Sequence, residues 1–308
     1  MTGHIYRTID VPVAGGALRV GVWDPETPEL DADGADSHAA SVLLVHGVTA
    51  SHLAWPFIVE GLPGVRVIAP DLRGRGRSNE VDGPAGLAAH AADLAAVLDE
   101  LGIERIVVVG HSMGAFVAVA FAYLYPERVT RLVLVDGGLP LDVPAGLDPD
   151  ELVSRILGPT AARLSMRFAD VGEYRDFWRE HPAFHTDWTP ELERYIAYDL
   201  VPDGDLLRPA TSYRTTVEDT IDMNTGTTLP AALAGLRHPT LLITVARGLM
   251  NEPPGLYAPE HLARLLDARP GIEHVRIADR NHYTIVMSRA GADAVAPLIL
   301  RELAAADA

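Results

Sequence analysis

The pentapeptide Gly-His-Ser-Met-Gly at 110–114 constrains the fold of this chain more than any other feature. It follows an apolar run at 106–109 that is typical of a buried strand, and a helix-like run follows at 115–125. A strand that turns sharply into a helix at Gly-x-Ser-x-Gly presents its serine above the carboxyl edge of a sheet, and glycine tolerates the tight turn. We therefore predict that Ser112 is a nucleophile and that the N–H of Met113, at the helix N-terminus, stabilises an anion.

Composition excludes several classes of function. The net charge of −17 argues against nucleic acid and against anionic membrane surfaces as partners. The chain has no cysteine and no lysine, which excludes disulfides, thiolate nucleophiles, Schiff bases and a phosphate-binding loop lysine. Residues 1–13 alternate like a strand and lack the pattern of a signal peptide, so we expect a soluble, cytoplasmic protein. The sequence does not decide between a monomer and a homodimer.

Apolar strands alternate with helical segments in two parts of the sequence. The predicted strands are 5–11, 18–23, 41–45, 65–69, 105–109, 131–135, 240–245 and 273–277. This alternation is typical of an α/β fold with a mostly parallel sheet covered on both faces. Between these two parts of the sequence lie about a hundred residues that are rich in proline, glycine and large aromatics and contain no convincing buried strand. We predict a core of 1–137 and 238–308 with an inserted helical cap at 138–237.

The nucleophile needs a general base. His282 follows the last predicted strand, where a loop passes over the carboxyl edge of the sheet. The chain has 12 histidines, and this position singles out His282 as the base for Ser112.

Four segments together resemble the α/β-hydrolase superfamily, in particular serine esterases and lactonases with a helical cap. They are Leu-Val-His-Gly at 44–47, Asp-Leu-Arg-Gly-Arg-Gly-Arg-Ser at 71–78, the pentapeptide at 110–114, and Asn-His at 281–282. The resemblance implies a central sheet flanked by helices, no cofactor, and a second oxyanion donor at the N–H of Val48. It also implies that the charges of 71–78 brace a loop and do not touch substrate.

The acid that orients His282 has two candidates. The common position in the superfamily follows the strand at 240–245, where this chain has no aspartate and the nearest carboxylate is Glu252. The other position is the end of the strand after the nucleophile helix, where this chain has Asp136, 24 residues after Ser112. Haloalkane dehalogenases and zearalenone-type lactonases carry their acid there. We favour Asp136 and keep Glu252 as the alternative, because an Asp-Gly pair also caps turns.

The inserted segment is expected to set specificity. We predict that a hydrophobic roof over the site binds substrate through Trp188, Phe184 and Trp178, and that Met250 and Tyr283 line the pocket near the base. For each cap aromatic, a place in the small core of the cap is the competing interpretation.

A metal site is not expected. The segment also contains His181, His185, Asp219 and Asp222, but their spacing fits no zinc pattern and we interpret them as solvated polar positions.

The sequence predicts a serine hydrolase that cleaves a neutral, hydrophobic ester or lactone, with a zearalenone-like macrolactone as one candidate. The serine argues against haloalkane dehalogenase and epoxide hydrolase activities, because the enzymes of this fold with those activities use aspartate there. A C–C bond hydrolase and a non-catalytic ligand receptor on the same fold are the alternatives, since fold alone does not prove activity.

Overall fold

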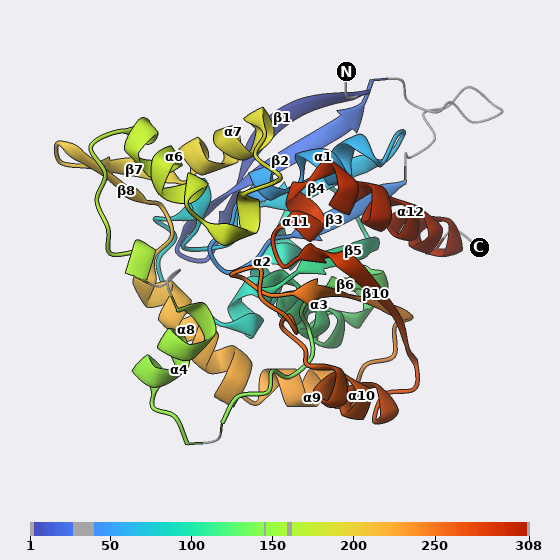
Figure 1. Ribbon diagram of the computed structural model, residues 1–308. Helices are drawn as coiled ribbons and strands as arrows, with labels where there is room; N and C mark the ends of the chain where they lie inside the picture. Colours follow the sequence, from blue (N-terminus) through green and yellow to red (C-terminus); the bar gives the residue numbers. More distant parts are fainter. Residues whose placement is uncertain (1–2, 27–39, 145, 159–161, 307–308) are drawn as a thin grey trace.

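An eight-stranded sheet organises the molecule, and the predicted mostly parallel arrangement is confirmed (Figure 1). The computed structural model describes residues 3–26, 40–144, 146–158 and 162–306. Its strand order is β1-β2-β4-β3-β5-β6-β9-β10, with β1 and β2 antiparallel to their neighbours and the other pairs parallel. The strands are β1 (His4–Val13), β2 (Gly16–Pro25), β3 (Ser41–Val45), β4 (Arg66–Pro70), β5 (Ile106–His111), β6 (Val129–Val135), β9 (Thr240–Arg247) and β10 (Ile272–Asn281).

Helices cover both faces of this sheet. One face carries α2 (Leu87–Glu100), α3 (Met113–Leu124), α9 (Thr228–Ala234) and α10 (Pro259–Asp267), and the other carries α1 (Pro56–Glu60), α11 (Thr284–Met287) and α12 (Arg289–Ala306). Strand side chains alternate between the two cores, as the period of two requires. In β3, Val42 and Leu44 join the core under α1 and α12, whereas Leu43 and Val45 join the core under α2 and α3. Both faces are apolar, which is why the parallel strands are nearly continuous hydrophobic runs.

The segment between β6 and β9 contributes helices and one small hairpin. It contains α4 (Pro149–Leu157), α6 (Val171–Arg179), α7 (Pro190–Tyr198), β7 (Leu200–Asp203), β8 (Leu206–Pro209) and α8 (Tyr213–Thr225), followed by α9. Figure 1 shows α4, α6, α7 and α8 gathered beside the sheet. The hairpin of β7 and β8 is only partly buried, so it lacks the apolar signal of a core strand. Helix α9 falls within 138–237 yet packs against α3 of the core.

The segment after β3 is divided, and the last strand is longer than the sequence indicated. Residues 52–60 form two pieces, a 3-10 turn at His52–Ala54 and α1 from Pro56, because a proline fits the first position of a helix better than its interior. The last strand runs beyond 277 to Asn281 after an irregularity in its pairing with β9. This extension carries the chain directly to His282.

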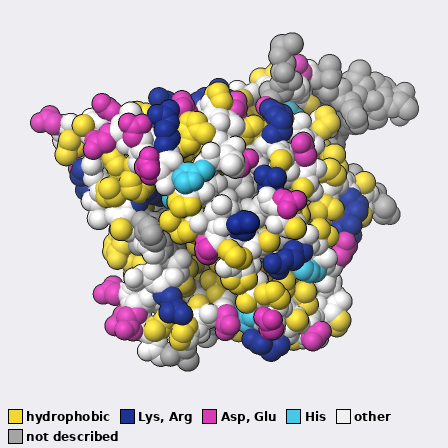
Figure 2. Space-filling model, in the orientation of Figure 1, with side chains coloured by type: hydrophobic (Ala, Val, Ile, Leu, Met, Phe, Trp, Pro, Cys, Tyr) yellow, Lys and Arg dark blue, Asp and Glu magenta, His cyan; other side chains and the backbone are white. Residues whose placement is uncertain are grey.

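Polar and apolar side chains alternate over the surface. Figure 2 shows acidic and basic side chains interspersed among apolar ones on one face. Within the described part of the chain, no helix has the length and apolar character needed to cross a membrane.

Candidate active site

Ser112 lies at the sharp turn between β5 and α3. Its backbone has φ 54° and ψ −125°, a conformation that costs a non-glycine residue energy and recurs at functional turns. The glycines on either side are required by close packing. A Cβ on Gly110 would lie 2.3 Å from the carbonyl oxygen of Gly114, and one on Gly114 would lie 2.0 Å from that of Val45. The local sequence therefore fixes the serine at the carboxyl end of the strand.

His282 connects Ser112 to Asp136. Its Nε2 lies 3.0 Å from the hydroxyl oxygen of Ser112, and its Nδ1 lies 2.6 Å from Oδ2 of Asp136. Asp136 directly follows β6 and is fully buried. A buried carboxylate accepts the Nδ1–H of the imidazole, which leaves Nε2 with a lone pair for the serine proton. The three side chains come from three strand ends, and the geometry is that of a nucleophile, a base and an orienting acid.

Backbone contacts hold the imidazole and the carboxylate in place. The N–H of His282 donates to the carbonyl of Arg247 at 3.0 Å, and the N–H of Asp136 donates to that of Ile243 at 2.7 Å. His111, inside the pentapeptide, donates from Nε2 to the carbonyl of His282 at 2.8 Å. Burial and the neighbouring His282 lower the pKa of His111 well below its ordinary value, so this ring stays neutral and keeps its lone N–H on that carbonyl.

The backbone of the loop after β3 passes directly over the serine. A Cβ added to Gly47 would lie 3.1 Å from Cβ of Ser112, so the backbone at Gly47, one residue before Val48, packs against the serine. The N–H of Met113 belongs to the first turn of α3, whose amides have no acceptor within the helix. Burial lowers the pKa of His46, the residue before Gly47, to about 4. Neutral His46 bridges the carbonyl of Gly47 and the N–H of Leu72 at 2.8 and 3.0 Å, which fixes the start of this loop.

A family model described as the alpha/beta hydrolase fold matches residues 40–175. The sheet order, the serine turn and the matched segment agree with one another. The chain has the α/β-hydrolase fold.

Known relatives match this chain over about a third of its length. Lipase LipV of Mycobacterium tuberculosis is 42% identical over 106 residues, 34% of this chain and 40% of that protein. The 2-hydroxy-6-oxo-2,4-heptadienoate hydrolase of Pseudomonas putida is 38% identical over 113 residues, 35% of this chain and 41% of that protein. The chain spans less than half the length of either relative.

Solved structures extend the likeness over nearly the whole chain. The thioesterase domain from the curacin biosynthetic pathway superposes with a TM-score of 0.73 at 23% identity, covering 96% of this chain and 99% of that one. At this identity the likeness shows the fold alone.

The predicted aromatic residues are divided between the surroundings of His282 and the outside of the inserted segment. Tyr283 follows His282, with ring centroids 5.8 Å apart, and the rings of Phe184 and Trp178 lie 5.2 and 6.3 Å from Tyr283. All three side chains are buried. Trp188 is half-buried and donates from Nε1 to Glu193 at 2.9 Å, so its polar edge is turned toward the cap surface. Met250 is 37% exposed on the loop after β9.

Glu252, the alternative acid, bonds within its own turn. Its Oε2 accepts the N–H of Met250 at 2.7 Å, and its carbonyl accepts the N–H of Gly248. This carboxylate therefore closes the loop after β9, whereas the Nδ1 hydrogen bond of His282 goes to Asp136.

The polar residues of the cap segment correct one expectation. Asp219 is buried rather than solvated, since its relative exposure is 1% and it pairs with Arg75 and His90. Among the described residues no cluster of three or more histidines or acids is arranged to hold a metal ion.

Asn281, a residue that organises the site, was not identified from the sequence. Its Oδ1 accepts the N–H groups of Tyr283 and Thr284, and its Nδ2 donates to the carbonyl of Ala183, which ties the turn after His282 to the cap segment.

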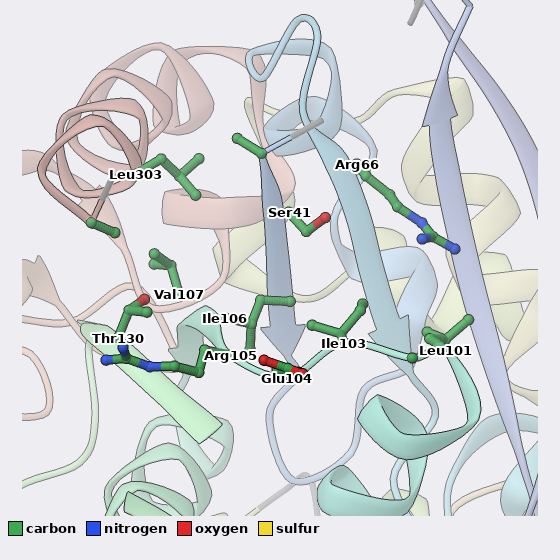
Figure 3. A pocket seen from close by; sticks show the side chains of 13 residues that line it. Ser41, Arg66, Leu101, Ile103, Glu104, Arg105, Ile106, Val107, Thr130 and Leu303 are labelled. Atoms are coloured by element: carbon green, nitrogen blue, oxygen red, sulfur yellow. The ribbon is translucent and has the colours of Figure 1, made fainter. Parts of the chain in front are cut away.

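A cavity of about 610 Å³ lies at the opposite, amino-terminal edge of the sheet (Figure 3). It is lined by the starts of β3, β4 and β5, including Ser41, Arg66 and Ile106. Ligands of open α/β sheets bind at the carboxyl ends of strands. We therefore assign the chemistry to the edge that carries Ser112.

Proposed function

We propose that this protein is a serine hydrolase that cleaves carboxylic esters or lactones through an acyl-serine intermediate. One observation carries the proposal. The 3.0 Å contact from Ser112 to His282 and the 2.6 Å contact from His282 to Asp136 connect the three side chains in one continuous hydrogen-bonded series, which is called the relay below.

The relay supports the following sequence of steps. The hydroxyl of Ser112 attacks the carbonyl carbon while Nε2 of His282 takes its proton. The oxyanion of the tetrahedral intermediate accepts hydrogen bonds from the N–H groups of Val48 and Met113. His282 then protonates the leaving alcohol, and the acyl-serine remains. Water, deprotonated by the same imidazole, releases the acid. With a lactone the leaving alcohol stays tethered and the product is a single hydroxy acid.

The surroundings of the relay favour an apolar substrate. Tyr283, Phe184 and Trp178 form a buried aromatic cluster beside His282. Aromatic side chains beside the base suit neutral, hydrophobic acyl or alcohol groups. A zearalenone-like macrolactone is the specific candidate, because Asp136 occupies the strand end where lactonases of that type carry their acid.

Two other activities use the same architecture. A C–C bond hydrolase shares the relay, and the similarity to the heptadienoate hydrolase of Pseudomonas putida favours this second candidate. Its usual acid follows the strand equivalent to β9, where this chain instead has Glu252 in a closed turn. A non-catalytic receptor is disfavoured by the intact contact between Ser112 and His282.

Hydrolysis of p-nitrophenyl acetate by the wild type and by Ser112→Ala tests the proposal. We expect the substitution to lower kcat by roughly 10³-fold or more, because the residue that forms the acyl intermediate is removed. Equal and negligible rates for both proteins would support the receptor. A series of p-nitrophenyl esters with longer acyl chains then tests the preference for apolar groups, which predicts that kcat/KM rises with chain length.

A further inference from the structure

Arg75 is a buried cation that contacts Val48 and Met113 and that the proposed mechanism does not use. It lies in the loop at 71–78 and its side chain is fully buried. A guanidinium carries five N–H donors in a fixed plane, so its partners define its position. The identity of these partners shows what the side chain holds together.

The two residues that carry the candidate oxyanion donors, Val48 and Met113, both contact this side chain. Nε of Arg75 donates to the carbonyl of Val48 at 2.8 Å, and Nη2 lies 3.7 Å from the sulfur of Met113. Nη1 donates to the carbonyl of Arg73 at 2.9 Å, which anchors the guanidinium to its own loop. The carbonyl of Val48 belongs to the peptide plane that leads to Thr49, next to the plane that carries the N–H of Val48. The contact with Arg75 therefore holds the position of the residue that carries the candidate donor.

The guanidinium of Arg75 also contacts helix α8. Nη1 of Arg75 lies 2.5 Å from Oδ2 of Asp219, which is 1% exposed. The other oxygen of Asp219 accepts the N–H of Gly86 at 2.7 Å and contacts Nε2 of His90 at 3.0 Å. Ser212, which precedes α8, donates its N–H to the carbonyl of Gly74 at 2.8 Å. The loop that holds Arg75 is thus attached directly to the inserted segment.

We propose that Arg75 is a positioning residue that aligns the oxyanion hole and that Asp219 couples this alignment to helix α8. The inference rests on the proposed function, since it assigns the amides of Val48 and Met113 to the oxyanion. Arg75 touches no reacting atom. Its contribution is to keep both donors directed at the site where negative charge develops, and such preorganisation acts mainly on the transition state.

Four variants test the assignment: Arg75→Met, Arg75→Lys, Asp219→Asn and Arg73→Met. Arg73 is the matched control, because it is a buried arginine of the same loop that forms a two-point ion pair with Asp93, at 2.6 and 2.7 Å, away from the serine. The measurements are kcat and KM for p-nitrophenyl acetate and the dissociation constant of phenylboronic acid, which adds to an active serine as a tetrahedral anion. Circular dichroism gives the folded fraction of each variant.

For Arg75→Met we expect kcat to fall roughly 10- to 100-fold with KM changed less than about threefold, below the cost of deleting an oxyanion donor outright. Boronate affinity falls by a similar factor. Arg75→Lys recovers part of the loss, since an ammonium cannot reproduce the planar fork. Asp219→Asn loses about three- to tenfold in kcat, because the guanidinium then faces an uncharged amide. Arg73→Met keeps kcat per folded molecule within about threefold, as its contacts lie outside the site.

Unchanged kcat and boronate affinity in Arg75→Met would overturn the proposal, and so would an equal loss in Arg73→Met. If Arg75→Met does not fold, Arg75→Lys and Asp219→Asn decide, and wild-type values in both would refute the coupling. Failure of the proposed function is separate from these outcomes. It appears as a wild-type protein whose hydrolysis does not depend on Ser112.

Discussion

At the scale of single residues, the acid beside His282 is the assignment to which geometry adds most. The sequence favours Asp136 and leaves Glu252 as the alternative. The side chain of Asp136 contacts Nδ1 of His282 at 2.6 Å, while Glu252 accepts the N–H of Met250. Local sequence signals could not decide this point, because the choice depends on how two strand ends meet across the sheet.

The matched pair Asp136→Asn and Glu252→Gln separates the two carboxylates. We expect Asp136→Asn to lower kcat by about 10²- to 10⁴-fold, because an amide favours the wrong tautomer of the imidazole. Glu252→Gln keeps an acceptor for the turn after β9 and is expected to change kcat less than about threefold. Steady-state hydrolysis of p-nitrophenyl acetate measures both. A larger loss in Glu252→Gln than in Asp136→Asn would show that the relay is assigned incorrectly.

At the scale of elements, helix α8 holds the first turn of α2 by its carboxylates. Glu218, Asp219 and Asp222 accept the successive N–H groups of Ala85, Gly86 and Leu87 at 3.0, 2.7 and 2.7 Å. Gly86, the residue before α2, has no capping side chain, so acids from a distant helix satisfy these amides and oppose the positive end of the helix dipole. We call these three acids the α8 clamp.

Removing one member of the α8 clamp is expected to lower the free energy of unfolding. Asp222→Ala deletes the acceptor for the N–H of Leu87, and loss of such a cap costs about 1 kcal/mol. Asp176→Ala is the control, since Asp176 is exposed and pairs with the neighbouring Arg179 on α6. Urea unfolding of both variants measures the difference. Equal stability of the two variants would mean that the clamp contributes nothing beyond an exposed ion pair.

The strands and helices of the core could be predicted, whereas the α8 clamp could not. Apolar runs and the turn at 110–114 locate β3, β5, α3 and β9. A strand that is buried on both faces consists of consecutive apolar residues, and such a run can be recognised in the sequence. The contacts between α8 and α2 join residues more than 130 positions apart. In the sequence, an aspartate that caps another helix cannot be distinguished from a solvated aspartate. The prediction that Asp219 is solvated is wrong for this reason.

At the scale of the whole molecule, buried neutral histidines make stability depend on pH. Burial lowers the pKa of His46 to about 4, below the value of about 6.5 for an unfolded histidine. Between these two values the unfolded chain binds a proton that the native state does not. The stability from keeping His46 neutral is therefore complete above about pH 6.5 and is lost as the pH falls toward 4.

We expect the free energy of unfolding to decrease by up to about 1.4 kcal/mol per pH unit for His46 in this window. His46→Gln removes the group and should flatten the dependence, whereas His185→Gln, at an exposed position, should leave it unchanged. Urea unfolding at pH 7 and pH 5 measures the slope. An equal slope in the wild type and in His46→Gln would show that this histidine is not the source.

The same scale explains why the specificity of the site was harder to predict than its chemistry. Ser112 and His282 are marked by short motifs next to strands, and the structure brings them together. The cap aromatics carry no such mark. Phe184 and Trp178 are buried beside Tyr283, whereas Trp188 bonds to Glu193, and only the packing of α6 and α7 distinguishes them.

The central claim is that folding places an activated hydroxyl at Ser112. Labelling of the folded protein with a fluorophosphonate, followed by peptide mass spectrometry, tests it most directly. The account predicts a single adduct on Ser112, with His282→Ala slowing its formation at least about 100-fold because the base is removed. Absence of any adduct on Ser112 in folded wild-type protein, or undiminished labelling in His282→Ala, would contradict it.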